Sequence, residues 1–247
     1  MSDKIVSREK SAIVHIKKFV ERAKDLIKEI SVDSLLEEGG INPYLVAALG
    51  VHTIEGVVEL FVYRRVERSL GTSFGKLFEN FLREVLGGVE GKKLDPKCRD
   101  RSQKEKPWIC WWDIVLPDKK IVMAVKSGPA DMDADQVRFF AQQARIAEQQ
   151  GYRPYLLFTY GKQAFNVIEN TLKRVGLDMT KYLRVGRQIF AEFLGNSDYY
   201  NHIIELLKSA SVGIDIFSLM ERKIKELTED LKKKYGDDID SLLRDLS

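Results

Sequence analysis

The chain has 247 residues, of which 44% are hydrophobic and 31% charged, and its formal net charge at pH 7 is +3. This composition is typical of a soluble globular protein, and the length suits one large domain or one domain with a helical appendage. No apolar run reaches the roughly 18–20 residues that a membrane span needs. We therefore expect no membrane association and a cytoplasmic location. The mildly basic charge permits a nucleic-acid partner without requiring one.

The two cysteines are Cys98 and Cys110. They are too few for a disulfide framework, and they lack the spacing of a zinc knuckle or a nearby histidine pair. We expect both thiols to be reduced and to take no part in function.

The first part of the chain has helical periodicity. Residues 8–38 carry apolar side chains at three- and four-residue spacing, which predicts one helix. The sequence predicts one or two short helices over residues 43–70. It predicts a further helix over residues 73–87, which Ser73 can cap at the N-terminus. A polar, highly charged loop is expected at 89–107.

From Trp108 the spacing of the apolar residues changes, and β-branched and aromatic residues typical of strands become frequent. The remaining elements are expected to be two strands, a helix, a strand, a helix, a short strand or turn and terminal helices, at Trp108–Leu116, Ile121–Val125, 133–150, Tyr155–Tyr160, 162–175, 184–194 and from Tyr199 to the end. This order predicts an α/β core framed by helical additions.

An acid and a lysine flank the predicted hairpin. Asp113 lies among apolar residues, where a carboxylate is costly to bury unless it is paired or bound to a metal. Lys126 ends the second strand, after a tight turn at Pro117–Lys120. Each residue taken alone could be an ordinary charge at a strand end. Together they place a carboxylate that can hold a divalent metal beside an ammonium that can orient or deprotonate an attacking water.

This hairpin resembles the half-site of the PD-(D/E)xK nucleases, whose usual pattern is Asp, a hairpin and then Glu-x-Lys. Ala124 stands at the position of that second acid. Because alternate residues of a strand share a face, Ala124 and Lys126 should point the same way. Three explanations stay open: the second acid has moved to a neighbouring element, a glutamate has been replaced by alanine in an engineered chain, or the site is naturally inactive.

A closer resemblance is to type II restriction endonucleases, especially the group that reads GGNCC-type interrupted palindromes. It spans roughly residues 40–160 and rests on the order and spacing of Ile41-Asn-Pro-Tyr44, Gly71-Thr-Ser-Phe-Gly-Lys-Leu-Phe-Glu79, Trp112-Asp113, Val125-Lys-Ser-Gly-Pro129 and Asp135-Gln136. In that family the Lys-Ser-Gly-Pro form can lack the standard glutamate, so Ala124 can be natural.

The resemblance implies a PD-(D/E)xK restriction-endonuclease-like α/β core, with a mixed sheet flanked by helices and with N- and C-terminal helical additions. We expect a single nuclease domain over 1–247. Within it, residues 1–70 would form a helical part, 71–195 the catalytic core and 196–247 the C-terminal helices.

The resemblance also implies a Mg²⁺ site. Asp113 would bind the metal and Lys126 would position the attacking water. Glu79, in the helix before the hairpin, or one of Asp131, Asp133 and Asp135, at the start of the following helix, would complete the ligand set together with the backbone carbonyl of Val125. The simpler alternatives are that Glu79 is a solvated helix residue and that these aspartates serve only the helix N-terminus.

Enzymes of this type bind double-stranded DNA as two-fold homodimers, so each protomer would read half a palindrome. Basic and amide side chains are the candidates for DNA contacts. They are Lys92, Lys93, Lys97, Arg99 and Arg101 in the charged loop and Gln136, Arg138, Gln142, Gln143 and Arg145 in the helix after the hairpin.

The alternative for these DNA candidates is a solvated, charged surface. For the whole chain, the alternative to an endonuclease is a non-catalytic DNA-binding protein on the same fold. A structural helical protein would leave the hairpin unexplained.

Overall fold

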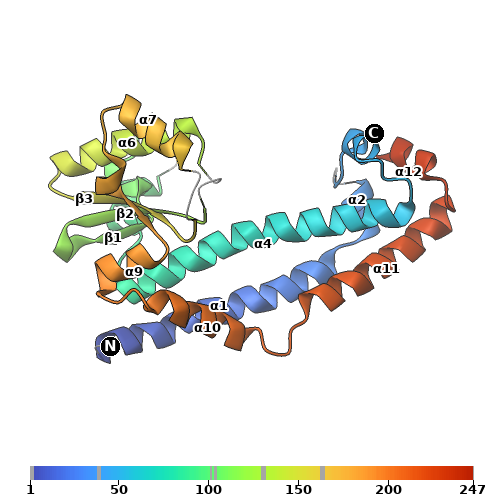
Figure 1. Cartoon of the computed structure of the whole chain (residues 1–247), viewed down its shortest axis with the longest axis horizontal. Helices are drawn as coiled ribbons and strands as arrows, with labels where there is room; N and C mark the ends of the chain where they lie inside the picture. The colour runs from blue at the N-terminus through green and yellow to red at the C-terminus, as the bar shows by residue number, and fades with distance from the viewer. Residues whose placement is uncertain are drawn as a thin grey trace. The chain divides into compact units, whose positions relative to one another are not determined.

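A computed structural model describes residues 3–37, 40–100, 102, 105–128, 132–161 and 165–246 (Figure 1). The chain forms two compact units. Unit 1 comprises the chain up to Ile16 and Phe74–Ala210, and unit 2 comprises Lys17–Ser73 and the chain from Ser211. Two long helices, α1 (Asp3–Glu29) and α4 (Ile54–Leu86), each contribute to both units. The single nuclease domain expected over 1–247 stays a prediction.

Unit 1 is an α/β unit built on a four-stranded mixed sheet in the order β1-β2-β3-β4. Strand β1 is antiparallel to β2, whereas β3 and β4 continue parallel to it. Besides its parts of α1 and α4, the unit contains, in chain order, α5 (Gly91–Leu94), β1 (Ile114–Leu116), β2 (Ile121–Lys126), α6 (Ala134–Gln149), β3 (Arg153–Phe158), α7 (Asn166–Arg174), α8 (Met179–Tyr182), β4 (Leu183–Val185), α9 (Arg187–Leu194) and α10 (Tyr199–Ala210). This is the mixed sheet with flanking helices that the sequence predicted.

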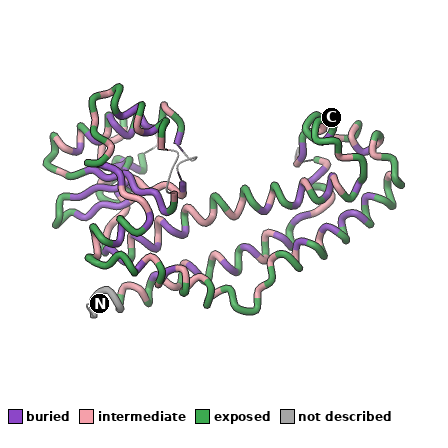
Figure 2. The backbone as a smooth tube through the Cα atoms, viewed as in Figure 1, coloured by how far each residue is buried: buried purple, intermediate pink, exposed green. Residues whose placement is uncertain are grey.

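Helices cover both faces of this sheet. On one face, Val122 and Leu156 of the sheet share an apolar core with Phe140 of α6 and Leu172 of α7, all of them buried. The strands of the sheet are largely buried along their length (Figure 2). On the other face, Tyr155 of β3 meets Phe193 of α9 with their ring centroids 5.0 Å apart. The ends of the strands are therefore the places where polar side chains can gather.

All regular secondary structure in the described residues of unit 2 is helical. Besides its parts of α1 and α4, it contains α2 (Val32–Leu36), α3 (Pro43–Ala48), α11 (Ile216–Tyr235) and α12 (Ile239–Asp245). Its core joins distant parts of the chain, with Ile27, Leu35, Val58, Leu231 and Leu242 all buried. Across the described chain, no helix is long and apolar enough to cross a membrane.

The predicted helix boundaries before the sheet need correction. The expected single helix at 8–38 is two helices, because Ser31 accepts a hydrogen bond from Ser34 N–H and caps α2. The expected break at 70–73 is wrong, since α4 continues through Gly71 and Gly75. Each glycine costs a helix only about 1 kcal/mol relative to alanine, and burial of the apolar face on both sides outweighs this cost.

The segment before β1 also differs from its prediction. Strand character was expected from Trp108, but Trp108–Trp111 is a 3-10 helix and β1 begins only at Ile114. Cys98 and Cys110 form a disulfide, so the prediction of reduced thiols is wrong. Gly91 packs so closely that a Cβ there would lie 2.0 Å from the carbonyl oxygen of Ile109. The charged region is thus held by short helical turns and a covalent link.

Candidate active site

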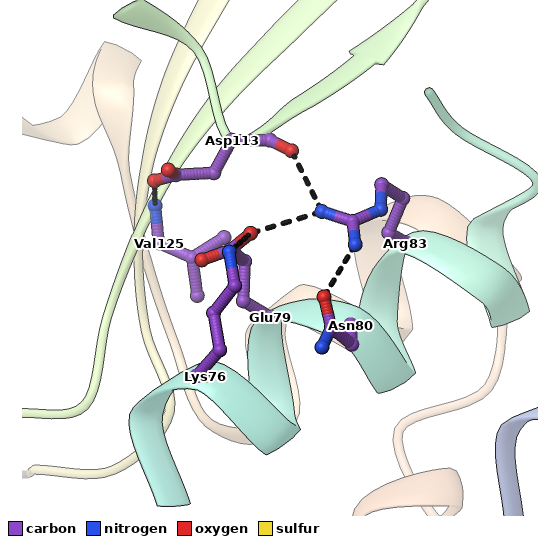
Figure 3. Close-up of polar contacts among 6 residues, drawn as sticks. All are labelled: Lys76, Glu79, Asn80, Arg83, Asp113 and Val125. Carbon is purple, nitrogen blue, oxygen red and sulfur yellow. Dashed lines mark hydrogen bonds and ion pairs between the residues drawn. The ribbon is translucent and has the colours of Figure 1, made fainter. Parts of the chain in front are cut away.

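Asp113 is held in position by two hydrogen bonds to strand β2, one from its backbone and one to its side chain. It lies between the 3-10 helix and β1, and its N–H donates to the carbonyl of Met123 at 3.0 Å. Its Oδ2 accepts a hydrogen bond from the N–H of Val125 at 2.8 Å (Figure 3). The carboxylate is therefore folded onto β2, the strand that ends in Lys126.

The end of β2 is held firmly by β3. The N–H of Thr159 donates to the carbonyl of Lys126 at 3.1 Å, and its hydroxyl donates to the carbonyl of Ser127 at 2.7 Å. Gly128 lies against the ring of Tyr160, where a Cβ would come within 2.6 Å of the ring. The Lys-Ser-Gly motif is thus a packed strand end, and small residues are needed for its close contacts.

A cavity of about 440 Å³ brings the sequence-predicted residues together. Asp113, Ala124 and Lys126 line it, so the prediction that Ala124 and Lys126 share a face is confirmed. Asp135 and Gln136 of α6 line it as well, and aromatic residues, among them Trp111 and Phe139, form its walls. A charged strand end therefore faces an amphipathic helix across an aromatic-walled cavity.

Glu79 reaches this region from α4. Its Oε1 lies 2.6 Å from Nζ of Lys76 and 2.9 Å from Nη1 of Arg83 (Figure 3). The same Nη1 donates to the backbone carbonyl of Asp113 at 3.4 Å, and Arg83 also donates to Oδ1 of Asn80. The side chain of Glu79 is only 13% exposed, so it is not the solvated helix residue of the simpler alternative.

The electrostatics of Asp113 follow from this packing. Burial raises the pKa of its carboxyl from 3.8 to about 6, and the negative charge of Glu79 adds to the rise. The hydrogen bond from the Val125 N–H and the positive charges of Lys126 and Lys76 act in the opposite direction on this pKa. Two carboxylates that approach each other in a poorly hydrated place destabilise their charged forms, and a cation held between them would relieve this.

The donor set fits a hard divalent cation. The described part of the chain holds no group of three His, Cys, Asp or Glu residues placed to bind a metal ion. Mg²⁺ prefers oxygen ligands and keeps several of its waters, so the two carboxylates of Asp113 and Glu79 suffice when a carbonyl or phosphate oxygen is added. Oε1 of Gln143, which lines the same cavity, is buried without a hydrogen-bond partner among the described residues and is a further oxygen donor.

The other residues predicted to bind Mg²⁺ are Asp131, Asp133, Asp135 and Val125. Asp131 lies outside the described residues, and none of the other three has a side chain buried beside Asp113 and Glu79. The side chain of Asp135 is 86% exposed at the cavity and forms an ion pair with Arg138. The N–H of Val125 is bound to Asp113, while the role of its carbonyl as a ligand stays a prediction. Asp133 accepts a hydrogen bond from Gln136 N–H and caps α6, which is the structural role anticipated for acids in this turn.

Most predicted DNA contacts lie outside this cavity. Lys92 and Lys93 are exposed on α5, Arg99 is exposed just after the turn that holds Cys98, and Gln142 is exposed on α6. Arg101 lies outside the described residues. The structure brings Asp113, Lys126 and Glu79 together, and it leaves the basic candidates dispersed over the surface of unit 1.

Sequence reasoning missed the residues that surround Glu79. Lys76 and Arg83 stand three residues before and four residues after it, which is the spacing of neighbours on a helix face. This signal was available in the sequence once residues 73–87 had been predicted helical. The walls of the cavity formed by Trp111 and Phe139, whose ring centroids are 5.1 Å apart, had no such local signal.

The mixed sheet flanked by helices is consistent with an α/β fold of the restriction-endonuclease type. Over residues 9–213 the chain matches the family model described as type II restriction endonuclease EcoO109I. This match covers most of the chain, which therefore belongs to that family of type II restriction endonucleases. A comparison with curated proteins found no match. The family acts on double-stranded DNA and cleaves it at specific sites.

Proposed function

We propose that this chain is a Mg²⁺-dependent type II restriction endonuclease that cuts both strands of DNA at a short, GGNCC-like palindrome. The observation that supports this best is the convergence of Asp113 and Lys126 on one cavity, with Glu79 electrostatically coupled to Asp113. Three chemically suited side chains come from three separate elements. Strand pairing and the packing of the helices bring them together.

Each residue has a distinct task in this proposal. Asp113 and Glu79 hold Mg²⁺, and Arg83 and Lys76 fix the orientation of Glu79. When bound, Mg²⁺ lowers the pKa of a coordinated water and neutralises charge that develops on the phosphate. Lys126 lies on the same cavity and orients the attacking water through its ammonium group, either by a hydrogen bond or by accepting a proton when neutral.

The DNA partner follows from the family, and its finer features belong to the proposal. A homodimer would present two such sites to the two strands of a palindrome. Guanine is best read by a bidentate arginine or lysine, so Arg99, Arg101 and Arg138 remain our candidates for base or phosphate contacts. A cytoplasmic location also remains a prediction.

Ala124 favours a second candidate function. It presents a methyl group to the cavity where the related motif has an acid, so this strand supplies only one carboxylate. A chain that lacked metal-dependent cleavage would act as a sequence-specific DNA-binding protein on the same fold.

Cleavage of plasmid and sequenced genomic DNA separates the two candidates. We expect discrete fragments in Mg²⁺ and none in EDTA, with mapped ends at one palindrome. Lys126→Ala should slow cleavage by about 10²–10⁴-fold, the range for a positioned acid or base. Lys119→Ala, which removes an exposed lysine of the β1–β2 turn, is the matched control and should cut normally. Tight, specific binding without fragments in any divalent metal would establish the second candidate instead.

A further inference from the structure

Unit 2 contains a cavity of about 830 Å³ that is lined by four arginines. Arg22 comes from α1, and Arg64, Arg65 and Arg68 come from α4. All four belong to the same compact unit, as does every other residue that lines this cavity. We call it the arginine cavity.

The arginines of α4 follow the period of the helix. Arg68 stands four positions after Arg64 and three after Arg65, so it neighbours both on one face of α4, and Ser69 and Thr72 extend that face toward the C-terminus. Like charges at this spacing destabilise a helix by a few tenths of a kcal/mol per pair. Among the described residues that line the arginine cavity, none is an aspartate or a glutamate.

Two arginines of unit 1 lie beside carboxylates. Arg83 pairs with Glu79, and Arg184 pairs with Glu192. In the arginine cavity, Arg65 lies over the ring of Phe61 at 5.9 Å, and the side chains of Arg22, Arg64 and Arg68 are exposed.

We propose that the arginine cavity binds phosphates of the DNA backbone away from the cleaved bond, an inference that rests on the proposed function. The guanidinium group is planar and always charged, and its donors match the oxygens of a phosphate. Arg64 and Arg68 are one turn apart, a rise of about 6 Å along α4. A DNA strand advances about 3.4 Å per phosphate along its axis, so the row can face more than one phosphate of a strand.

The side chains around the arginines suit this ligand. Ser69, Thr72 and Asn42 also line the arginine cavity. Their hydroxyl and amide groups can donate hydrogen bonds to phosphate oxygens. Contacts of this kind carry no sequence information. They would strengthen binding to any duplex long enough to reach unit 2.

The salt dependence of DNA binding tests the proposal. The intact protein is titrated with a duplex that carries the cleavage site and long flanks, in Ca²⁺ to prevent cutting, at about 50 to 200 mM salt. Arg64→Gln with Arg68→Gln should reduce the slope of log affinity against log salt by about 0.9 for each phosphate that is no longer neutralised, or about 1.8 per protomer. Over this salt range the affinity of the variant should fall about tenfold less per protomer than that of the unsubstituted protein.

Two further double variants test whether the salt slope depends on the positive charge of the arginine cavity or on the net charge of the protein. Arg64→Lys with Arg68→Lys keeps both charges and should keep the original slope. Arg222→Gln with Lys225→Gln removes two charges from exposed positions of α11, outside the arginine cavity, and should leave the slope and the cleavage rate unchanged. Thermal unfolding of each variant shows whether unit 2 remains folded.

The possible results have distinct meanings. The inference is overturned if the slope is unchanged in Arg64→Gln with Arg68→Gln. It is also overturned if the slope falls as much in Arg222→Gln with Lys225→Gln, or in Arg64→Lys with Arg68→Lys. Either result leaves the endonuclease proposal intact. A protein that neither cuts nor specifically binds any DNA overturns the proposed function itself, and this would be evident before any variant is made.

Discussion

Asp113 shows how one side chain can serve both structure and chemistry. Its Oδ2 accepts a hydrogen bond from the backbone N–H of Val125, so the carboxylate is bound directly to strand β2. Its charge is nevertheless poorly stabilised, because it is partly buried and Glu79 lies nearby. A carboxyl in this state resists ionisation unless a cation lies beside it, and a bound divalent metal would supply that positive charge.

The raised pKa of Asp113 predicts how stability depends on pH. The folded protein holds this proton more tightly than the unfolded chain does, because the pKa is about 6 when folded against 3.8. The stabilising contribution of protonated Asp113 is therefore complete below about pH 4 and is lost as the pH rises through 6. At pH 8 without metal, Asp113→Asn, which keeps an acceptor for Val125, should be more stable than the original chain by up to about 3 kcal/mol.

Urea unfolding in EDTA at pH 4 and at pH 8 measures this difference. Asp118→Asn, an exposed acid of the turn after β1, is the control and should show no pH-dependent gain. Adding Mg²⁺ at pH 8 should stabilise the original chain more than Asp113→Asn. An equal gain for Asp113→Asn at both pH values would mean that the carboxyl titrates normally.

Ala124 can be tested by supplying the acid that it lacks. If a glutamate was replaced there, Ala124→Glu should raise Mg²⁺-dependent cleavage strongly, on the order of 10²-fold or more for a recovered catalytic group. If Glu79 has taken over as the second acid, a third carboxylate crowds the cavity and activity should fall or stay flat. Single-turnover cleavage rates of the two proteins decide between these accounts. Inactivity of both would favour the DNA-binding candidate.

At the scale of elements, the sequence was informative where one period dominated. The helix at 133–150 and the strand at Tyr155–Tyr160 were predicted close to the observed α6 and β3, because their apolar residues keep a single spacing. Residues 108–112 were not, since two neighbouring tryptophans and an isoleucine suit a strand as well as a 3-10 turn. The deciding contact there, between Gly91 and the backbone at Ile109, is 18 positions apart and has no local signature.

The candidate site was predictable to a similar degree. Asp113 and Lys126 could be paired because a hairpin brings its two ends together whatever the rest of the fold does. The burial of Glu79 depends on how α4 packs against the residues beside Asp113, which periodicity alone does not determine. The sequence predicted a charged loop for the basic residues at 92–99, whereas the structure has short helical turns there, among them Pro96–Cys98, and a disulfide.

The disulfide is an element whose removal has a calculable effect. Cys98 and Cys110 are 12 positions apart, and closing a loop of about this size stabilises a fold by about 3 kcal/mol in the chain-entropy description. Cys98→Ser with Cys110→Ser should therefore lower the free energy of unfolding by about 2–3 kcal/mol, measured in urea under oxidising conditions. A reductant should destabilise the original chain by the same amount and leave the double variant unaffected. No effect of reductant on the original chain would contradict the link.

At the scale of the whole molecule, exposed apolar side chains bear on assembly. Phe217 and Val212 of unit 2 are 68% and 81% exposed, and Leu49 of the same unit is 58% exposed. Single exposed apolar residues are common, whereas apolar residues that form one contiguous patch are typical of a surface that associates with a partner. A homodimer would cover such residues and would match the symmetry of a palindromic DNA site.

Light scattering on the protein with and without a palindromic duplex tests the homodimer. We expect two chains per duplex, and we expect Phe217→Asp to shift the protein toward monomers because a buried charge in an apolar interface is costly. Val167→Asp, at a 53% exposed residue of unit 1, makes the same kind of change and should leave the dimer intact. If the original chain is a monomer on its DNA at every concentration, one protomer cannot cut both strands symmetrically. The two-fold reading of a palindrome would then have to be abandoned even if cleavage itself is observed.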